Sequence, residues 1–569
     1  MAGNCLHAAM PAKSAAALDR RSFMRLSLSA TGALVLSVYL PPRSASANAT
    51  SASGSPIGML VRIEKDGTTF IGARSPEIGQ GVKTSLPMII AEEMDADWSK
   101  VKVEQLPLGI QRRDDGTFTW KYGPQGAGGS TNIPDAWADL RQVGAQVRHV
   151  LLSAAAQHWN AQLAELSTEA GVVIHKDGRR IGYGELATAA AALPLSQEKL
   201  PLKDPKQYRI LGTRVRVVDA EEIVTGRARY GLDATLPGAL IAVVARCPNF
   251  DGELKSFDAS EARKIRGVRD VVVLTGPKHG EPITANLAPG VAVIADDTWS
   301  AIKGRQALKI EWTSGPYASE SSASLDAQCT RLLEGEGQRV RNDGDFDAAR
   351  ASAAQVVQAR YRVPFVSHAP LEPQNACVDV RSDRVVIVAP MQMPSGASRI
   401  ASQITGLDRS KIEVHMTRVG GGFGRRLTND FIAEAVQLSK TTGRPIKLVW
   451  TREDDLRHDF YRPFGHHDLI ATVDTERRVT GWAHRLASAS KYYRRPDVKP
   501  EDMWTAEIYS DDFPARLLPN VRMEWFAVDS GIVRGSWRAP AHTANAFAVQ
   551  SFLDEIAHAT REDPLALRL

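Results

Sequence analysis

The sequence predicts a mixed α/β protein of several domains, and three observations point to this class. The chain has 569 residues, and domains of roughly 150 residues imply three or four of them. Hydrophobic residues make up 43% and charged residues 24% of the chain, a balance that excludes wholesale disorder. Segments with the two-residue period of strands also alternate with segments whose apolar residues recur every three or four positions.

The charge and the cysteine content exclude several functional classes. The net charge is +5, and the first 47 residues contribute +4 of it through five basic residues against one acidic residue. The remaining chain is nearly neutral, so it lacks the large net positive charge that is typical of proteins that bind nucleic acid or anionic lipid. The 4 cysteines show no CxxC spacing, which argues against a zinc ribbon, an iron–sulfur cluster, c-type haem attachment and a disulfide framework.

Residues 1–47 are expected to be an export signal rather than part of the fold. The paired arginines Arg20 and Arg21 precede an uncharged, mildly apolar run at 26–40, and a small-x-small cleavage pattern follows at 45–47. The run is shorter than the roughly 20 residues of a membrane span. This pattern favours a twin-arginine signal, with an ordinary Sec signal or an N-terminal anchor as the alternatives. Residues 48–56 are then a flexible leader, and the mature protein is expected in the periplasm, with any membrane association supplied by partners.

Strands and helices are predicted in an alternating order along the mature chain. A hairpin is predicted at 59–70, and further strands at 98–106, 307–312, 385–388, 411–419 and 446–450. Helices are predicted at 86–94, 133–159, around 260–264, and at 430–440. Thr131 or Asn132 can cap the long helix. The Pro- and Lys-rich stretch at 193–207 and the Ser-, Gly- and Glu-rich stretch at 313–345 are typical of connections.

Glycine-rich segments at 77–81, 126–132 and 420–426 each lie between a predicted strand and a predicted helix. Glycines at such turns let backbone N–H groups approach an anion, and a helix N-terminus adds partial positive charge. The segments are neither P-loops, since no GK[ST] follows, nor dinucleotide fingerprints, since Arg425 stands where GxGxxG requires glycine. A single loop of this kind is more often only a turn. Three of them, accompanied by the polar residues at 80, 130 and 131, favour a large phosphorylated cofactor.

Several motifs, taken in order, resemble the molybdenum hydroxylases, the family of xanthine dehydrogenase and aldehyde oxidase. Residues 419–426, Val-Gly-Gly-Gly-Phe-Gly-Arg-Arg, resemble the GGGFG loop of the large subunit. The Gly-Phe-Gly-Arg-Arg ending is most similar to the branch of isoquinoline 1-oxidoreductase β-subunits, which includes membrane-associated aldehyde dehydrogenases. Residues 368–374, 390–392 and 535–540 resemble the family's H-x-x-L-E-P-Q strand entry, its glutamine segment and its substrate-pocket turn. Residues 211–230 resemble the start of an α/β hammerhead domain.

This resemblance implies a multi-domain molybdopterin-binding fold, mixed α/β or α+β in class, that contains an α/β hammerhead domain. The implied parts are an N-terminal molybdopterin-binding segment at 57–205, the hammerhead domain at 206–315, a linker at 316–350 and a molybdopterin-binding domain at 351–569. The glycine-rich loops that precede the hammerhead domain match the order of parts in the isoquinoline branch. The end of the chain resembles the middle of the family's molybdenum-binding region, so C-terminal truncation is expected.

The resemblance also implies residue roles. Gln392 would bond a molybdenum oxygen, Phe423 and its flanking glycines would place N–H groups near the metal's oxygen ligands, and Arg538 would line the substrate pocket. The family's large subunit needs no protein ligand to molybdenum, so no metal-ligating residue is expected. The residues expected to bind molybdopterin cytosine dinucleotide are Gly79, Gln80, Gly81, Gly128, Gly129, Ser130, Thr131, Gly422, Phe423 and Gly424.

Two classes of function remain open at this stage. The first is the large subunit of an exported molybdenum hydroxylase that oxidises an aldehyde or N-heterocycle with water as oxygen donor. Its electrons would pass to a separate small [2Fe-2S] subunit and on to a c-type cytochrome, because this chain lacks cluster cysteines. The second is a non-catalytic fragment or binding subunit, because the family's general base, a Glu in a G-x-G-E loop near the C-terminus, has no match here. An exported hydrolase is a remote third reading, because no G-x-S-x-G elbow is present.

The pattern closest to that catalytic loop is Gly182-Tyr183-Gly184-Glu185, and its carboxylate is better interpreted as a helix-start residue. Structural alternatives also stand beside the implied roles. Gln392 could cap a strand, Arg538 could be an ion-pair partner, and Phe423 or Trp537 could be core aromatics.

Two further pairs of residues carry open alternatives. Arg425 and Arg426 fit either a patch for cofactor phosphates or a solvated face. His466 and His467 suggest a metal pair, but adjacent residues on a strand point to opposite faces, which argues against shared ligation.

Overall fold

The computed structural model describes residues 25–28, 34–37, 60–196 and 198–569. The expected cleavage site and leader lie outside these residues. The chain forms two compact units that are each discontinuous in sequence. Unit 1 comprises the described residues up to 240 together with 375–421 and 426–448, and unit 2 comprises 241–374, 422–425 and 449–569. The boundary after residue 240 differs from the predicted hammerhead start at 206, because residues 206–240 belong to unit 1.

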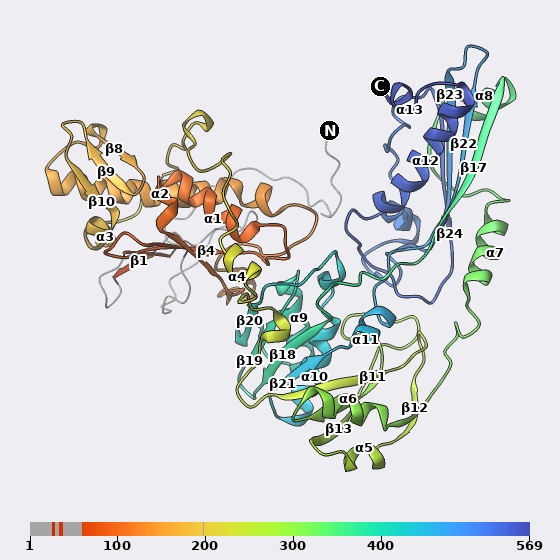
Figure 1. The fold of residues 1–569 in the computed structure, drawn as a ribbon, viewed down its shortest axis with the longest axis horizontal. Helices are drawn as coiled ribbons and strands as arrows, with labels where there is room; N and C mark the ends of the chain where they lie inside the picture. Colours follow the sequence, from red (N-terminus) through yellow and green to blue (C-terminus); the bar gives the residue numbers. More distant parts are fainter. Residues whose placement is uncertain (1–24, 29–33, 38–59, 197) are drawn as a thin grey trace. The chain divides into compact units, whose positions relative to one another are not determined.

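Unit 1 begins with a five-stranded sheet packed against two helices (Figure 1). Its strands, in sheet order, are β1 (Arg25–Leu28), β2 (Leu34–Ser37), β3 (Val61–Ile63), β4 (Thr69–Ala73) and β5 (Val101–Gln105). The hairpin predicted at 59–70 is confirmed as β3 and β4. Because β4 and β5 run parallel, they need a crossover, and helix α1 (Val82–Glu93) supplies it. The apolar face of α2 (Asn132–Trp159) completes this core, as its periodicity predicts.

Strands β1 and β2 fall within the segment predicted to be an export signal. The structure pairs them with each other and pairs β2 with β3. These pairings concern the chain with its first 47 residues attached, and the export signal stays a prediction.

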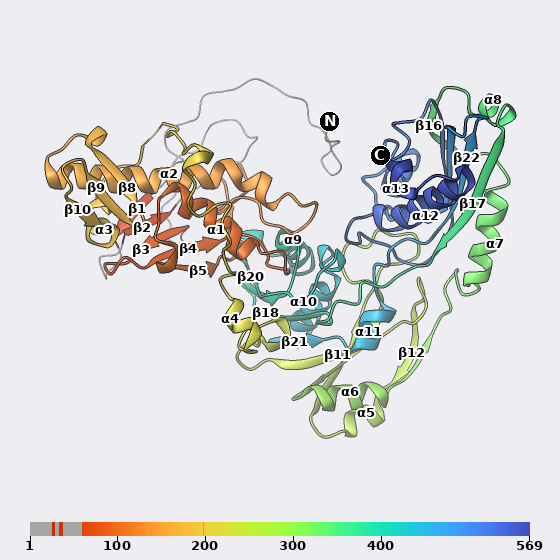
Figure 2. The same cartoon turned by 45° about the horizontal axis from the view of Figure 1, so that its top comes forward.

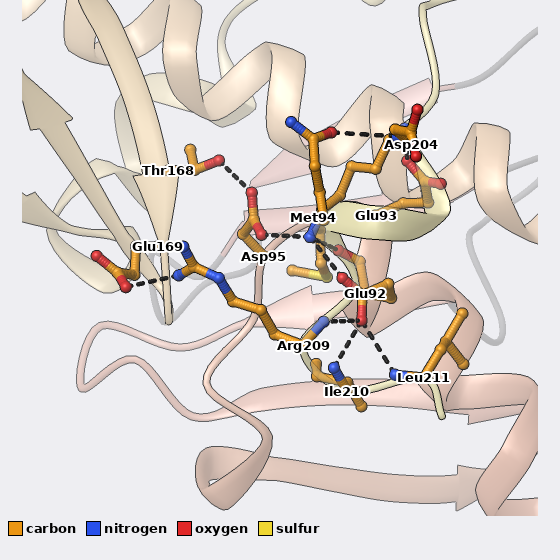
Figure 3. Close-up of polar contacts among 12 residues, drawn as sticks. Glu92, Glu93, Met94, Asp95, Thr168, Glu169, Asp204, Arg209, Ile210 and Leu211 are labelled. Atoms are coloured by element: carbon orange, nitrogen blue, oxygen red, sulfur yellow. Dashed lines mark hydrogen bonds and ion pairs between the residues drawn. The ribbon is translucent and has the colours of Figure 1, made fainter. Parts of the chain in front are cut away.

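A buried carboxylate at the end of α1 ties the predicted connection at 193–207 and the residues after it to the core (Figure 3). Oε2 of Glu92 accepts hydrogen bonds from the N–H groups of Arg209, Ile210 and Leu211 at 2.9, 2.7 and 3.0 Å. Oε1 accepts one from Lys203 Nζ at 2.5 Å. Burial would raise the pKa of Glu92, but Lys203 and the backbone N–H groups outweigh it and lower the pKa below 4.5.

Two small β elements and a four-stranded group complete unit 1. The small sheet of β8 (Leu166–Glu169), β9 (Val172–His175) and β10 (Arg180–Gly182) precedes α3 (Tyr183–Ala191), and β6 (Ile110–Arg112) pairs with β7 (Phe118–Trp120). The second part of the unit has the strand order β21-β18-β19-β20, where β18 is Asn375–Val380, β19 Val385–Ala389, β20 Ile412–Met416 and β21 Ile446–Val449. Helices α9 (Pro394–Thr405) and α10 (Asp430–Thr442) pack with these strands, and the short α4 (Ala220–Val224) lies earlier in the chain.

Unit 2 starts with a compact group of short strands and helices. The antiparallel order is β13-β14-β11, with β11 Leu240–Arg246, β13 Val268–Leu274 and β14 Gly290–Ala295. A separate ribbon joins β12 (Leu254–Asp258) to β15 (Lys309–Trp312). The predicted short helix is confirmed as α5 (Ser260–Lys264), and α6 (Thr298–Gln306) packs on β14.

The larger part of unit 2 is a five-stranded sheet with helix α12 (His542–Thr560) against it, as both views show (Figure 2). The strand order is β16 (Gln338–Asp343), β24 (Asn520–Ala527), β23 (Val479–Ser488), β22 (Gly465–Val473) and β17 (Gln355–Val363). Its core includes Leu469, Trp482, Phe552 and Ile556. Helices α11 (Arg452–Arg457) and α13 (Pro564–Arg568) complete the unit.

The stretch at 316–350, predicted to be a linker, instead forms structure. It contains α7 (Ser322–Leu332), β16 and nearly all of α8 (Phe346–Ala351), and β16 pairs with β24. The prediction is wrong because serine-rich sequence also begins helices. The Ser321 side chain accepts a hydrogen bond from the N–H of Ser324 and caps α7. In the part of the chain that the structure describes, no helix is both long and apolar enough to cross a bilayer.

Candidate functional site

The first glycine-rich loop leads directly into α1, and the carboxylate of Glu77, at the start of the loop, binds the loop's backbone N–H groups. The Glu77 side chain is buried, and its Oε1 accepts hydrogen bonds from the N–H groups of Gly79 and Gly81 at 2.7 and 3.2 Å. Its Oε2 accepts one from the N–H of Lys83 at 2.9 Å. These N–H groups were expected to face a cofactor phosphate. The structure shows that they bind a carboxylate, which preforms the loop at the helix start.

Gln80 is held inside the same loop. Its Oε1 accepts a hydrogen bond from the N–H of Ile78 at 2.7 Å, and its Nε2 donates one to the Pro76 carbonyl at 2.9 Å. Gly79 and Gly81 have φ of 102° and 86°, and apart from the adjoining residues no atom of the described chain lies within 4 Å of where either Cβ would be. The backbone conformation therefore favours glycine, and the space beside both residues is open to a ligand.

The second glycine-rich loop leaves the start of a long helix exposed. Gly129 and Ser130 adopt left-handed φ of 62° and 58°, and both are exposed together with Thr131. Thr131 is the N-cap of the 28-residue helix α2, but its side chain makes no capping hydrogen bond. Asn132, the other predicted cap, donates to the Gly126 carbonyl at 2.5 Å instead. This helix start combines a positive dipole end with two hydroxyl groups, a donor set that suits an anion.

Gln392 joins this second loop to the end of the third one. Its side chain is buried, with Nε2 donating to the Ala127 carbonyl at 2.6 Å and Oε1 accepting from the Arg426 N–H at 3.3 Å. Its backbone bonds to the same two residues, at 2.8 Å to the Ala127 N–H and 2.9 Å to the Arg426 carbonyl. Both ends of the amide therefore contact protein, and the implied contact with a molybdenum oxygen stays a prediction.

The paired arginines are both fully buried, which excludes a solvated face. Arg426 belongs to unit 1, where its Nε donates to the Gly421 carbonyl at 3.0 Å and its Nη1 to the Pro390 carbonyl at 3.2 Å. Arg425 belongs to unit 2, where its Nε lies 2.9 Å from a carboxylate oxygen of Asp459. Both guanidinium groups therefore brace the glycine loop through protein contacts.

In unit 2, the tip of the third loop packs against the turn at 535–540. Gly424 has φ of 108°, and a Cβ there would lie 1.9 Å from the carbonyl oxygen of Ser536, so the contact requires glycine. Phe423 has a left-handed φ of 55°, which is uncommon for a bulky residue, and its side chain is 40% exposed. An exposed aromatic ring held in a strained backbone conformation is typical of a functional site rather than of a core.

A buried charge network fixes this turn. Asp459 bonds to His368 Nδ1 at 3.0 Å and forms an ion pair with Arg425, whose Nε lies 2.9 Å away. His368 Nε2 lies 2.9 Å from the Ser536 carbonyl, so the ring links Asp459 to the turn. The Trp537 ring stacks on His368 with centroids 4.8 Å apart. Burial would raise the pKa of the Asp459 carboxyl, but His368 and Arg425 outweigh it and lower the pKa below 3.8.

Arg538 and Glu185 occupy different surroundings. Arg538 is exposed on the 535–540 turn, and within the described ranges its side chain makes no ion pair, so the structural alternative is not realised. Glu185 is confirmed as a helix-start carboxylate, because its Oε1 accepts a hydrogen bond from the Gly182 N–H at 3.0 Å.

The histidine pair on β22 is bound to other residues. His466 Nε2 lies 2.7 Å from Asp326 Oδ1, and His467 Nδ1 lies 2.9 Å from His484 Nε2. Among the residues that the structure describes, no cluster of three or more His, Cys, Asp or Glu side chains could hold a metal ion.

The structure thus brings together two sets of predicted site residues. In unit 1, the 126–131 loop meets Gln392. In unit 2, Gly424, which follows Phe423, lies against the turn that carries Arg538. Sequence reasoning missed Glu77 and Asp459. Glu77 carried a signal, because it stands at the start of the first loop, but nothing local marks Asp459.

Comparisons with known proteins identify the family of this chain. Models of a molybdopterin cofactor-binding domain match residues 34–229 and 332–569. The beta subunit of isoquinoline 1-oxidoreductase from Brevundimonas diminuta is 28% identical over 97% of this chain and 75% of its own length. The Gluconacetobacter polyoxogenes protein named membrane-bound aldehyde dehydrogenase (pyrroloquinoline-quinone) is also 28% identical, over 89% of this chain and 66% of its own.

Two further matches extend these comparisons. A nicotinate dehydrogenase subunit of Pseudomonas putida is 26% identical over 90% of this chain, which spans 42% of that relative. Among solved structures, the aldehyde oxidoreductase of Desulfovibrio gigas matches with a TM-score of 0.50 at 18% identity, over 68% of this chain and 46% of that one. That structural likeness shows a shared fold.

Proposed function

Because the chain belongs to the molybdenum hydroxylase family, as a large subunit similar to the isoquinoline 1-oxidoreductase β-subunit, we propose that it is the molybdenum-binding subunit of an oxidoreductase for aldehydes or N-heterocycles. In the proposed reaction, water donates the oxygen, and the substrate and the water together release two protons and two electrons. The names of the relatives support both substrate classes.

The observation that carries this proposal is the exposed start of α2. Ser130 and Thr131 offer two hydroxyl groups and a helix N-terminus that no side chain caps, and this donor set fits the phosphates of molybdopterin cytosine dinucleotide. Gln392 holds the loop in place from behind. The bound cofactor supplies the two-electron redox chemistry, and the protein positions it.

The unit 2 residues would act on the substrate side. The Phe423 ring, exposed on a strained loop tip, offers an aromatic contact surface for an aldehyde or heterocycle. Arg538, exposed on the adjoining turn, would hold a polar group of the substrate. The His368 and Asp459 network keeps loop and turn together and thereby maintains this surface.

We also propose an electron-accepting partner and an exported location. The described cysteines Cys247, Cys329 and Cys377 are buried and widely separated in sequence, so they are unsuited to hold an iron–sulfur cluster together. A small [2Fe-2S] subunit would therefore receive the electrons and pass them to a c-type cytochrome. The paired arginines at 20 and 21 support twin-arginine export to the periplasm.

The test is a Ser130→Asp variant of the protein purified with its co-expressed partners. The aspartate tolerates the left-handed conformation and favours a helix start, so α2 stays folded, but its charge repels a phosphate. We expect the wild-type protein to contain molybdenum and to release cytidine monophosphate on hydrolysis, and the variant to lose both at least tenfold. Ser321→Asp at the start of α7 is the matched control and should keep both. A wild-type protein without molybdenum or cytosine nucleotide would refute the proposal.

A further inference from the structure

We propose that a groove in unit 1 binds an extended, acidic segment of a partner polypeptide, which adds as a strand to the open edge of β5. All residues that line the groove belong to unit 1, and they come from the start of α1, from β5, from within 218–235 and from 416–418. The inference goes beyond the proposed function and does not rest on it, because it concerns assembly rather than the cofactor or the reaction.

The groove lies where two sheet edges of unit 1 approach each other. Among the described strands, β5 and β20 are each the last in their sheet order, and Figure 2 shows both. The chain after β5 reaches Leu108, whose N–H donates to the Val414 carbonyl of β20 at 3.1 Å and joins the two edges. Beyond this joint, 101–103 and 416–418 line a groove of about 910 Å³. Binding pockets of proteins measure roughly 300–1,000 Å³, so the groove is large enough for a short peptide.

The hydrogen-bond register of β5 shows which of its backbone groups are open. β5 runs parallel to β4, with Val103 opposite Ile71. The N–H of Leu106 donates to the Ala73 carbonyl of β4 at 2.9 Å. Because successive residues of a strand direct their N–H and C=O groups to alternate sides, Val103 points both groups away from β4. Such an edge is a template for a further strand.

A second open edge lines the groove at the end of β20. The N–H of Thr417 donates to the Ala389 carbonyl of β19 at 3.3 Å. By the same alternation, Met416 directs its N–H and C=O away from β19, and the next residue on that side, Arg418, forms a single bridge with Tyr230. A strand that enters the groove therefore meets open backbone groups on both β5 and β20.

The side chains of the groove favour a negatively charged occupant. The cations that line it are Lys83, Lys102, Arg227, Arg229 and Arg418, and the anions are Asp219 and Glu222. Asp219 is already compensated, because its Oδ2 lies 3.2 Å from Lys83 Nζ and 2.5 Å from Arg418 Nη1. Lys102 and Arg229 are exposed and form no ion pair within the described part of the chain. Carboxylates on the occupant would compensate these two cations.

A polypeptide fits the groove better than a small organic anion does. A small anion would use the cations and leave the backbone edge of Val103 unpaired. A peptide strand repeats its own N–H and C=O groups at the spacing of β5, and its side chains point alternately to opposite faces. The half-buried Val101 and Val103 offer apolar contact on one face, and Lys102 lies exposed between them. Acidic residues that alternate with apolar ones match this pattern.

The first test uses the purified chain and a fluorescent peptide of three Glu-Val repeats. We expect this probe to bind more weakly as salt rises, and a peptide of Lys-Val repeats to bind at least about tenfold more weakly than the acidic one. Lys102→Glu with Arg229→Glu should weaken binding of the acidic probe at least about tenfold. Arg180→Glu with Lys206→Glu, exposed cations of unit 1 outside the groove, should leave it unchanged. No binding, or equal effects of the two double variants, would refute the proposal.

The second test concerns the backbone edge. Val103→Pro removes the outward N–H, and proline is tolerated on an unpaired edge. Val103→Thr is the matched control, because it keeps the N–H and the β-branched shape. The proline variant should bind the acidic probe about tenfold more weakly than the threonine variant. An N-methylated acidic probe should lose as much against the wild-type chain, which tests the strand even if the proline variant misfolds. Undiminished binding of the N-methylated probe would refute an added strand and indicate recognition by charge alone.

The third test examines the chain together with its co-expressed partners. Hydrogen exchange at the Val103 and Met416 amides should be at least about tenfold slower in the complex than in the isolated chain. A carbodiimide should join the Lys102 amine to a carboxylate of the partner. Unchanged exchange at both amides would refute a partner at this groove. None of these measurements involves the metal or turnover, so absence of molybdenum would refute the proposed function and leave this inference unaffected.

Discussion

Replacing Asp459 by asparagine should be among the most destabilising conservative changes in unit 2. The carboxylate is buried, forms an ion pair with the buried Arg425 guanidinium at 2.9 Å and bonds to His368 Nδ1 at 3.0 Å. Asparagine has nearly the same size, so packing is retained while Arg425 loses its counter-charge. Removing one partner of a buried pair costs about 3 to 5 kcal/mol. At about 2 to 4 °C per kcal/mol for a domain of this size, the unfolding temperature of unit 2 should fall by about 6 to 20 °C.

The matched control for this change is Asp347→Asn, which breaks an exposed ion pair with Arg522 in the same unit. Such pairs contribute about 0 to 1 kcal/mol, so the control should move the unfolding temperature by less than about 4 °C. Thermal unfolding followed by tryptophan fluorescence measures the unfolding temperatures of both variants. Because the folded pKa of Asp459 lies below 3.8, its contribution is present above that pH and is lost as the pH falls through the lowered value. The two curves should therefore converge in acid. An Asp459→Asn variant as stable as the control at pH 7 would show that the network does not hold the turn.

Three other predictions concern the glycine loop, unit 1 and export. Gly424→Ala should cost more than about 3 kcal/mol, because its Cβ would lie 1.9 Å from a carbonyl oxygen, whereas Gly406→Ala, with open space around it, should cost about 1 to 2 kcal/mol. Equal losses in chemical denaturation would contradict the close approach. Glu92→Gln should destabilise unit 1 by about 3 kcal/mol at pH 7, with faster hydrogen exchange at 203–211. The deficit should be full above pH 4.5 and should shrink as the pH falls from there through the lowered pKa of the folded Glu92 carboxylate, where that group becomes protonated. Changing both arginines at 20 and 21 to lysine should retain a folded reporter in the cytoplasm, and Sec-dependent export would contradict the twin-arginine signal.

Local patterns account for the parts of the fold that the sequence predicted well. The apolar period at 133–159 matches α2, and the helix predicted at 430–440 is α10, which ends where Gly443 takes a left-handed conformation. Hairpin β3–β4 follows from two short strands joined by a turn. The linker predicted at 316–350 is wrong because a local pattern cannot show a distant partner. Strand β16 in this stretch gains stability from pairing with β24, about 180 residues further along the chain.

The sequence by itself determined where the glycine-rich loops lie, which family they resemble and which helix starts follow them, because these features depend on neighbouring residues. Only the tertiary structure decided what the loops contact. Gln392 bonds to Ala127 across 265 positions, and His368 meets Asp459 across 91. Arg425 and Arg426 are adjacent and chemically alike, yet one pairs with a buried carboxylate and the other with backbone carbonyls. No local pattern encodes such partners, because burial and counter-charge arise only when distant segments pack together.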